Sequence, residues 1–470
     1  MTKINQNNSI HQKNIVVIGN GMVGQRFCEK LVARDQTQQY KITTFCEEPR
    51  AAYDRVGLTS FFAHRDAEKL MLAKMDWYQS HQITLHIGDR ANRINRKKQI
   101  VYSDKGVEIG YDALVLATGS YPFVPKIDGI HKAGVFIYRT IEDLERIIAY
   151  GAKVKRATVI GGGLLGLEAA KAVYDLQLQT DIVECAPRLM PRQIDDAGSS
   201  ILVRQIEALG VAVHLNKMAE EILGNGAVEG IRFQDGSVLN TDMIIVSAGI
   251  CPRDDLAREA GLNVGTRGGI MVNDQLQTDD PAIYAIGETV LHRGIVYGLV
   301  APGYVMAETL ATNLTGGDAL FTGTDLSAKL KLMGVDVACF GQYEIGPDQS
   351  KPLTWEDPFE GKYKKLLFSP DGTHLLGGML VGDASDYGIL SIMAKSSAPL
   401  SCKPFELIMG KSGGASLGGI ESMPDDAQIC SCNNVTKGAI CKTIQEKKLT
   451  AVGQVKEATK AGTGCGGCMP

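Results

Sequence analysis

Hydrophobic and polar positions follow one another along the chain in blocks that predict strands alternating with helices. A short β-branched run at 14–18 (NIVVI) predicts a buried strand, and the pattern at 25–34 predicts a helix after a glycine-rich turn. A second strand is expected at 41–45. The same order returns with a strand at 157–160, followed by a helix and by a strand that ends at Val183. Two strand–helix–strand units, roughly 140 residues apart, therefore indicate an internal duplication.

Further patterning completes the expected organisation. Strands that close the two units are expected at 111–119 and 242–249, and another leads into a glycine turn at 278–288. Alternating positions at 332–381 predict a β-rich region, and Gly, Ser, Pro and Asp at 411–426 predict a linker. The expected fold class is α/β, with two Rossmann-like dinucleotide-binding domains, a β-rich α+β domain and a small C-terminal module. The expected boundaries are a disordered tail at 1–13, a first dinucleotide-binding domain at 14–140 and 266–318, a second at 141–265, a β-rich domain at 319–410, the linker, and the module at 427–470.

Composition excludes several classes of function. The chain has 470 residues, 44% of them hydrophobic and 22% charged, and its formal net charge of −4 provides no basic field for nucleic acid. No apolar stretch approaches the roughly 20 residues of a membrane helix, and the polar opening segment lacks the apolar core of a signal peptide. We therefore expect a cytoplasmic protein whose eleven cysteines are thiols or metal ligands rather than disulfides.

The first glycine motif has the context of a dinucleotide site. Gly19 permits a tight turn, Gly21 lets the backbone approach a pyrophosphate, and Gly24 lets the helix pack closely on the strand. The N-terminus of the helix then offers oriented N–H groups and a partial positive charge to the anion. Glu47, which is 23 residues beyond Gly24, can accept hydrogen bonds from a ribose diol.

The second motif repeats the first. Gly161, Gly163 and Gly166 have the same spacing, and Glu184 lies 18 residues beyond Gly166. A carboxylate there binds the ribose hydroxyls and repels a 2′-phosphate, so NADH is favoured over NADPH, although the nearby Arg188 weakens that preference. One such motif alone is weak evidence, since ordinary α/β turns also contain glycines. Two motifs with two acids indicate two dinucleotides, and FAD with NAD(P)H would form a hydride relay.

Four cysteines in two close pairs mark the C-terminal module. Cys430-x-Cys432 is followed by Cys465-x-x-Cys468, among glycines that leave the backbone free to curl around a ligand. By spacing alone, these thiolates suit either tetrahedral zinc or an iron–sulfur cluster. A one-electron cluster complements a flavin, whereas zinc has no redox chemistry, so an iron–sulfur cluster is favoured over zinc. Cys441 fits neither pair and is left out of the ligand set.

The ordered phrases GNGMVG, LVLATGS, VIGGGLLGLEAA, VSAGICPR and YAIGE resemble the two-dinucleotide flavoprotein disulfide-reductase superfamily across 14–317. The resemblance implies FAD at the first motif and NAD(P)H at the second. It also implies that Arg55 contacts FAD and that Glu168 lies near the nicotinamide. The position of Glu168 in an expected helix suits a solvated residue equally well. No general acid or base is identified. Besides the residues already named, the implied FAD contacts are Met22, Val23, Thr118, Gly119, Gly287 and Glu288, and the implied NAD(P)H contacts are Leu164, Leu165 and Gly249.

One feature of that superfamily is missing. Its disulfide reductases carry a C-x4-C pair soon after the first acid, whereas residues 47–61 contain no cysteine. A dithiol mechanism is therefore not expected. The CSC and CGGC pairs of the C-terminal module, with the helix expected at 437–447, resemble instead the bacterioferritin-associated ferredoxin type of [2Fe-2S] domain.

A closer resemblance covers 14–468. The phrases ITTFCEEPRAAYDRVGLTSFF, YRTIEDL, VECAPRLMPRQID and LSAKLKLMGVDVACFG resemble the N-terminal half of the assimilatory NAD(P)H nitrite reductase large subunit. That family continues into a sirohaem domain, so this chain is expected to be the electron-input half, passing electrons to a sirohaem nitrite reductase or a molybdenum nitrate reductase subunit. The resemblance is also compatible with a homodimer. The alternatives are an NADH-dependent rubredoxin or ferredoxin reductase, and a redox- or iron-sensing iron–sulfur flavoprotein.

Overall fold

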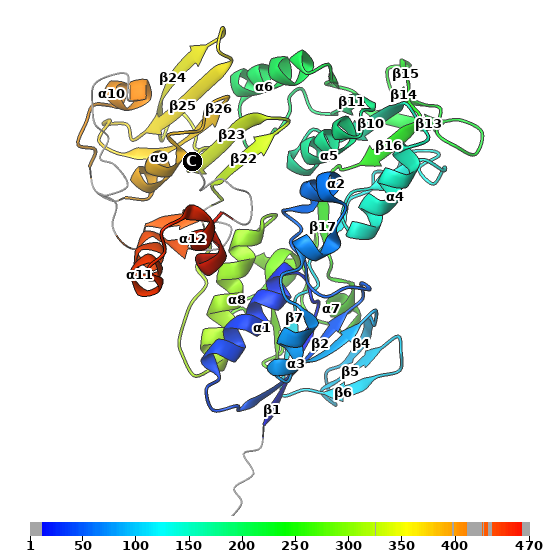
Figure 1. Cartoon of the computed structure of the whole chain (residues 1–470), viewed down its shortest axis with the longest axis vertical. Helices are drawn as coiled ribbons and strands as arrows, with labels where there is room; N and C mark the ends of the chain where they lie inside the picture. The colour runs from blue at the N-terminus through cyan, green and yellow to red at the C-terminus, as the bar shows by residue number, and fades with distance from the viewer. Residues whose placement is uncertain are drawn as a thin grey trace, which may run out of the picture. The chain divides into compact units, whose positions relative to one another are not determined.

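The structure, a computed structural model, describes residues 12–324, 326–396, 399–410, 425, 427–430 and 435–462. Most of the predicted tail and of the predicted linker therefore lies outside the described residues. Contacts divide the chain into two compact units, each assembled from separated segments (Figure 1). The first unit comprises Met1–Asp54, Glu68–Tyr121 and Ile250–Thr324, and the second comprises Arg55–Ala67, Pro122–Gly249 and Asp325–Pro470.

A five-stranded parallel sheet forms the centre of the first unit. Its strand order is β19-β7-β1-β2-β3. The central strands are apolar along most of their length and buried, as expected where both faces of a parallel sheet are covered. Helices α1 (Met22–Arg34) and α8 (Val300–Leu314) pack against each other (Figure 1). The strands are β1 (Lys13–Ile18), β2 (Tyr40–Cys46), β3 (Thr84–Ile87), β7 (Ala113–Leu116) and β19 (Ile283–Ala285).

Two small sheets and several short helices complete the first unit. The antiparallel sheet β4-β5-β6 is one, and the sheet β18-β20-β21 is the other. The chain passes between the units near β8 (Ser120–Pro122) and β17 (Ile250–Pro252). The bounds are β4 (Ala91–Asn95), β5 (Ile100–Ser103), β6 (Glu108–Gly110), β18 (Ile270–Val272), β20 (Val290–His292), β21 (Ile295–Val296), α3 (Met75–Ser80), α7 (Asp255–Glu259), η2 (Ala67–Leu70) and η3 (Gly287–Thr289).

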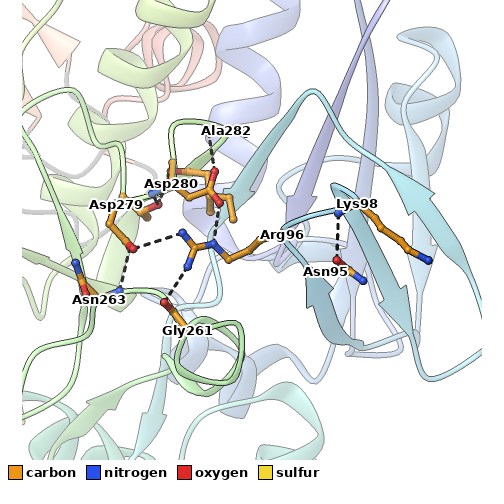
Figure 2. Close-up of polar contacts among 10 residues, drawn as sticks. Asn95, Arg96, Lys98, Gly261, Asn263, Asp279, Asp280 and Ala282 are labelled. Atoms are coloured by element: carbon orange, nitrogen blue, oxygen red, sulfur yellow. Dashed lines mark hydrogen bonds and ion pairs between the residues drawn. The ribbon is translucent and has the colours of Figure 1, made fainter.

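Arg96, the residue after β4, forms hydrogen bonds with the loop that leads into β19 (Figure 2). Its Nε donates to the carboxylate of Asp280 (2.7 Å), and one Nη donates to the carbonyl oxygen of Gly261 (2.8 Å). The other Nη lies 3.4 Å from the carboxylate of Asp279. Asp280 in turn accepts from the backbone N–H of Ala282, one residue before β19. Arg96 therefore links the end of β4 to the loop that precedes β19.

The second unit repeats the parallel sheet. Its strand order is β12-β11-β10-β16-β9, and the three central strands are buried. The predicted boundaries place 135–137 in the first dinucleotide-binding domain, whereas this segment, β9, pairs with β16 of the second sheet. The boundaries themselves stay a prediction. The bounds are β9 (Val135–Ile137), β10 (Arg156–Ile160), β11 (Gln179–Val183), β12 (Ala212–His214), β16 (Met243–Val246), α4 (Ile141–Gly151), α5 (Leu164–Asp175) and α6 (Asp196–Ala208), with the small sheet β13 (Ala219–Leu223), β14 (Gly230–Phe233) and β15 (Val238–Asn240), and with η1 (Leu58–Ser60) and α2 (Phe61–His64).

A five-stranded antiparallel sheet follows in the same unit, in the order β22-β23-β26-β25-β24. Phe340, Leu366 and Leu380 lie in the core that it shares with α9 and α10. The strands are β22 (Ala328–Leu332), β23 (Val335–Gly341), β24 (Lys351–Asp357), β25 (Lys362–Phe368) and β26 (Leu375–Val381), and the helices are α9 (Tyr387–Lys395) and α10 (Pro404–Met409). The two parallel sheets and this antiparallel sheet confirm the predicted fold class.

The C-terminal module contains a short β-hairpin and two helices. These are β27 (Gln428–Cys430), β28 (Val435–Thr436), α11 (Lys437–Lys447) and α12 (Val452–Thr459). The helix expected at 437–447 is present with those bounds. Cys430 is buried in a small core with Val435 and Ala461.

Candidate functional site

The first glycine loop leaves space in front of a helix N-terminus. Gly19 has a φ of +112°, and a Cβ there would lie 2.2 Å from the carbonyl oxygen of Ala117. A Cβ at Gly24 would lie 2.0 Å from the carbonyl oxygen of Gly19, so any larger residue would force α1 away from β1. Gly21, the N-cap of α1, has open space around its missing Cβ and gives the helix no side-chain cap. The N-terminus of α1, with its N–H groups and partial positive charge, thus faces a loop that suits an anion such as a pyrophosphate.

A pocket lies beside this loop, within the first unit. It encloses about 440 Å³ of space, part of it open to solvent. Glu47, the residue after β2, is one of the lining residues, and its contact with a ribose stays a prediction. Its lining combines a glycine, apolar side chains and charged groups, as a nucleotide site does. The lining residues are Ile18, Gly19, Phe45, Glu47, Asp89, Arg90, Ala91, Thr118, Arg253, Asp255 and Leu256.

The other predicted FAD residues of this unit lie along neighbouring loops. Gly287 has a φ of +84°, and a Cβ there would lie 3.4 Å from the side chain of Val23. Glu288 accepts a hydrogen bond from the hydroxyl of Ser120 (2.6 Å). Met22 opens α1, and Thr118 and Gly119 follow β7. The fold thus gathers three of the sequence phrases at the carboxyl ends of parallel strands, where open α/β sheets bind ligands.

Sequence reasoning missed Arg253, which the fold brings to this pocket. Its guanidinium forms a two-pronged ion pair with the carboxylate of Glu47. It also missed Asn20, which is buried within the glycine loop. The Asn20 side-chain oxygen accepts from the N–H of Ala52 (2.9 Å) and the hydroxyl of Tyr78 (3.1 Å). The phrase VSAGICPR contains Arg253, but nothing in its spacing points to Glu47.

The second glycine loop has the same local geometry. A Cβ at Gly161 (φ +121°) would lie 2.2 Å from the carbonyl oxygen of Ser247, and one at Gly166 would lie 1.8 Å from that of Gly161. Gly163, the N-cap of α5, faces open space, as Gly21 does. Leu164 and Leu165 open α5. Gly249, at a φ of +116°, also has no atom near its missing Cβ.

Glu184 is turned toward its own loop. One carboxylate oxygen accepts from the backbone N–H of Gly162 (2.6 Å), and the other accepts from that of Ala186 (2.8 Å). The residue is only 9% exposed. Arg188, which weakens the expectation of NADH, pairs with Asp196 (2.9 Å) and donates to the carbonyl oxygen of Pro191 (3.2 Å). Glu184 therefore shapes its own loop, and its contact with a ribose stays a prediction.

The remaining predicted residues lie on the second unit. Arg55 donates to the carbonyl oxygen of Arg139 (3.0 Å). Glu168 lies on α5, near the buried hydroxyl of Tyr138. Burial, and then the charge of Glu168, raise the pKa of Tyr138 well above its ordinary value, and Tyr138 shares a hydrogen bond with Thr59 (3.0 Å). Contacts of Arg55 with FAD and of Glu168 with a nicotinamide stay predictions.

Of the four predicted cluster ligands, Cys430 is the described one. It ends β27 and is 2% exposed. Cys432, Cys465 and Cys468 lie outside the described residues. Cys441, which the sequence leaves out of the ligand set, is exposed on α11. The hairpin, the helices and the buried thiol are compatible with a cluster at this end of the chain.

Fold and loops together define a reductase that binds two dinucleotides and carries a cysteine module. The chain belongs to the pyridine nucleotide-disulphide oxidoreductase family, which residues 13–307 match, and its residues 428–470 match the BFD-like [2Fe-2S] binding domain. It is an NAD(P)H-dependent oxidoreductase whose cofactors are FAD and a [2Fe-2S] cluster. The predicted superfamily and cofactors are thereby confirmed.

Three individual proteins are similar to most of this chain. The chain is 47% identical to the nitrite reductase (NADH) large subunit of Escherichia coli over 97% of its own length and 54% of that protein. It is 36% identical to the assimilatory nitrate reductase electron transfer subunit of Bacillus subtilis, over 98% of this chain and 59% of that one. The chain thus spans about half the length of these relatives. The ferredoxin reductase for the CYP199A2 system of Rhodopseudomonas palustris superimposes with a TM-score of 0.74, at 25% identity, over 84% of this chain and 100% of that chain.

A membrane segment is not found in the described part of the chain: none of its helices is long and apolar enough to span a bilayer.

Proposed function

We propose that this chain is the electron-input part of an assimilatory nitrite or nitrate reductase, taking hydride from NAD(P)H and passing electrons on singly. One observation carries the proposal. Two glycine loops open in front of uncapped helix N-termini, at Gly21 and Gly163, in a chain whose last residues match a [2Fe-2S] domain. Two dinucleotide sites supply a hydride relay, and the cluster supplies a one-electron exit.

The first loop is assigned to FAD. Gly19, Gly21 and Gly24 bring the backbone N–H groups of α1 to the pyrophosphate, and Glu47 accepts from the adenosine ribose. Bound flavin accepts a hydride as an electron pair and can release the electrons one at a time. The protein's part is to bind and orient it. The remaining residues assigned to this site are Met22, Val23, Arg55, Thr118, Gly119, Gly287 and Glu288.

The second loop is assigned to NAD(P)H, with NADH preferred. Gly161, Gly163 and Gly166 place the N-terminus of α5 at the pyrophosphate, and the charge of Glu184 disfavours a 2′-phosphate. The dinucleotide gives up its hydride and leaves as NAD⁺. Orientation of the nicotinamide supplies most of the rate effect, since hydride transfer needs no conspicuous general acid or base. Leu164, Leu165 and Gly249 complete the assigned set, and Glu168 is a candidate near the nicotinamide.

The cluster is assigned to Cys430, Cys432, Cys465 and Cys468. Electrons that leave it go to a sirohaem nitrite reductase or a molybdenum nitrate reductase subunit, in keeping with the names of the relatives. By this proposal, the chain reduces dyes with NADH. A rubredoxin or ferredoxin reductase would share both dinucleotide loops and differ only in its acceptor.

An anaerobic titration of the purified chain with NADH tests the relay. We expect the bound flavin to bleach and a reduced-cluster EPR signal to follow. Flavin that bleaches while the cluster stays oxidised would make the module a sensor or a structural element. Protein that contains zinc but neither iron nor sulfide would overturn the electron exit.

A cytoplasmic location and a homodimer also belong to this proposal. Cell fractionation tests the location. Light scattering of the eluting chain tests the dimer, which a mass near 50.6 kDa, that of one chain, would contradict.

A further inference from the structure

We propose that Arg253 is the positioning residue of the FAD adenosine site. It holds Glu47 ready for the ribose and joins two further segments that line the site. The inference rests on the assignment of FAD to the first glycine loop. Arg253 and Glu47 are 206 residues apart in the sequence, yet they lie in contact within the first unit.

The backbone of Arg253 joins two loops. Its N–H donates to the carbonyl oxygen of Gly119 (2.9 Å). Its carbonyl oxygen accepts from the hydroxyls of Thr118 (2.6 Å) and Thr289 (2.9 Å), which lie 3.1 Å from each other. Thr289 is fully buried, so this small network is shielded from water. The peptide groups of one residue thus set the spacing of the loop after β7 and the turn at η3.

The side chain of Arg253 reaches the third segment. Both of its terminal nitrogens donate to Glu47, one to each carboxylate oxygen. Its guanidinium carbon lies 4.7 Å from the ring centre of Tyr121, which supports the cation from the other side. The Arg253 side chain is 18% exposed, against 37% for Glu47, so the cation is the more rigidly held partner.

Electrostatics favour the pair as part of the site. Three acids (Glu47, Asp89 and Asp255) and two cations (Arg90 and Arg253) line the pocket, and Arg90 lies 4.0 Å from Glu47. Loss of the Arg253 charge would leave three acids facing one cation, a local excess of negative charge. The phosphates of FAD would meet that excess. Burial by itself lowers the pKa of Arg253, but the hydrogen bonds and charge of Glu47 outweigh it and raise the pKa, so the guanidinium stays charged.

The ion pair leaves room for the ribose. A carboxylate has about four acceptor positions, and a two-pronged guanidinium uses one on each oxygen. The ribose hydroxyls can donate to those that remain. Arg253 therefore orients Glu47 without consuming its capacity to bind the diol.

Binding of flavins to apoprotein of the full chain tests the inference. We expect Arg253→Ala to weaken FAD binding by about 10- to 100-fold, the range for breaking a partly buried charge pair. Binding of FMN, which lacks the adenosine half, should change by less than about threefold, a distinction that general destabilisation would not make. Arg253→Lys should recover part of the loss, since a lysine keeps the charge but not the fork. Fluorescence quenching gives both dissociation constants.

Arg293→Ala is the matched control. Arg293 forms the same kind of two-pronged pair with Asp274 (3.0 and 2.6 Å) in the same unit, outside the pocket. Its loss should leave FAD binding within about twofold. Equal loss of FAD binding in the Arg253→Ala and Arg293→Ala proteins would overturn the inference.

A double-substitution cycle supplies a second measurement that needs no FMN. If Arg253 acts through Glu47, adding Arg253→Ala to the Glu47→Ala protein should weaken FAD binding no further. Independent, multiplicative losses would refute the positioning role. Failure of the proposed function would give a different result. If FAD does not bind at the first glycine loop, Gly24→Val should leave FAD affinity unchanged, whatever the effect of Arg253→Ala.

Discussion

At the scale of single residues, steric constraints explain where glycines are required, and electrostatic interactions determine the partners of the acids. Gly19 and Gly161 both adopt a positive φ, and Gly24 and Gly166 both sit against a carbonyl oxygen where a Cβ has no room. These needs are local, so the glycines were predictable from their spacing. The partners of the two acids were not. Glu47 pairs with Arg253, and Glu184 binds the backbone of its own loop.

The position of Glu184 leads to a prediction about cofactor choice. Glu184→Ala removes the charge that opposes a 2′-phosphate, so the ratio of kcat/KM for NADH to that for NADPH should fall about tenfold, equivalent to ~1.4 kcal/mol. Because Gly162 also loses its acceptor, KM should rise for both cofactors. Steady-state dye reduction gives the ratio. Arg188→Ala is the control, since its guanidinium is engaged by Asp196, and an unchanged ratio in the Glu184→Ala protein would contradict the role.

At the scale of elements, a few side chains fix how helices and strands meet. The N-cap of α6, Asp195, accepts from the N–H of Gly198 (3.1 Å), the hydroxyl of Tyr363 (2.8 Å) and the ammonium of Lys365 (2.8 Å). It thus caps its helix and also fastens that helix to β25. Burial opposes ionisation of Asp195, but the hydrogen bonds from Lys365, Gly198 and Tyr363 outweigh it and lower the pKa.

Asp195→Asn should therefore lower the free energy of unfolding by about 1–2 kcal/mol at neutral pH. Because the folded-state pKa is lowered, the stabilisation is present above the unfolded-state pKa of about 3.9 and is lost as pH falls through the folded value. The gap between wild type and variant should be constant near neutrality and shrink in acid. Urea unfolding across a pH series measures it. Asp196→Asn is the control, because that carboxylate is 83% exposed, and a gap that widened in acid would refute the argument.

The Arg96 contacts give a second prediction at this scale. Arg96→Ala removes the guanidinium from the partly exposed carboxylates of Asp279 and Asp280 (Figure 2). The free energy of unfolding of the flavin-loaded chain, measured by thermal unfolding, should therefore fall by about 1–2 kcal/mol. Arg93→Ala, on the same strand, is the control. Arg93 lies over the exposed face of Tyr102 (3.9 Å) and should cost less than about 1 kcal/mol. Equal losses in the two proteins would show that Arg96 has no special role.

At the scale of the whole molecule, the chain unites two dinucleotide loops and a cysteine module that serve different steps. The first glycine loop lies within the first compact unit and the second lies within the second. The module has its own small core around Cys430 and Val435. Substitution in the module should consequently leave the dinucleotide loops folded. Hydride entry and electron exit are therefore separable by experiment.

Cys430→Ser should abolish the iron and sulfide content of the purified chain, while its flavin content stays near one per chain. Metal analysis and the flavin absorbance measure the two contents. Cys441→Ser is the matched control, because this cysteine is exposed on α11 and outside the predicted ligand set. A full cluster in the Cys430→Ser protein would remove Cys430 from that set.

The sequence by itself determined the features that depend on near neighbours: the buried strand runs, the glycines that precede α1 and α5, the acids that follow β2 and β11, and the close spacing of the C-terminal cysteines. Each follows from a local steric or chemical need that leaves a fixed spacing. Only the tertiary structure decided that Arg253 meets Glu47, that Glu184 turns to Gly162, and that Arg96 holds Asp280. Two of these pairs join segments about 200 residues apart, and no spacing rule links side chains that become neighbours only when the chain folds.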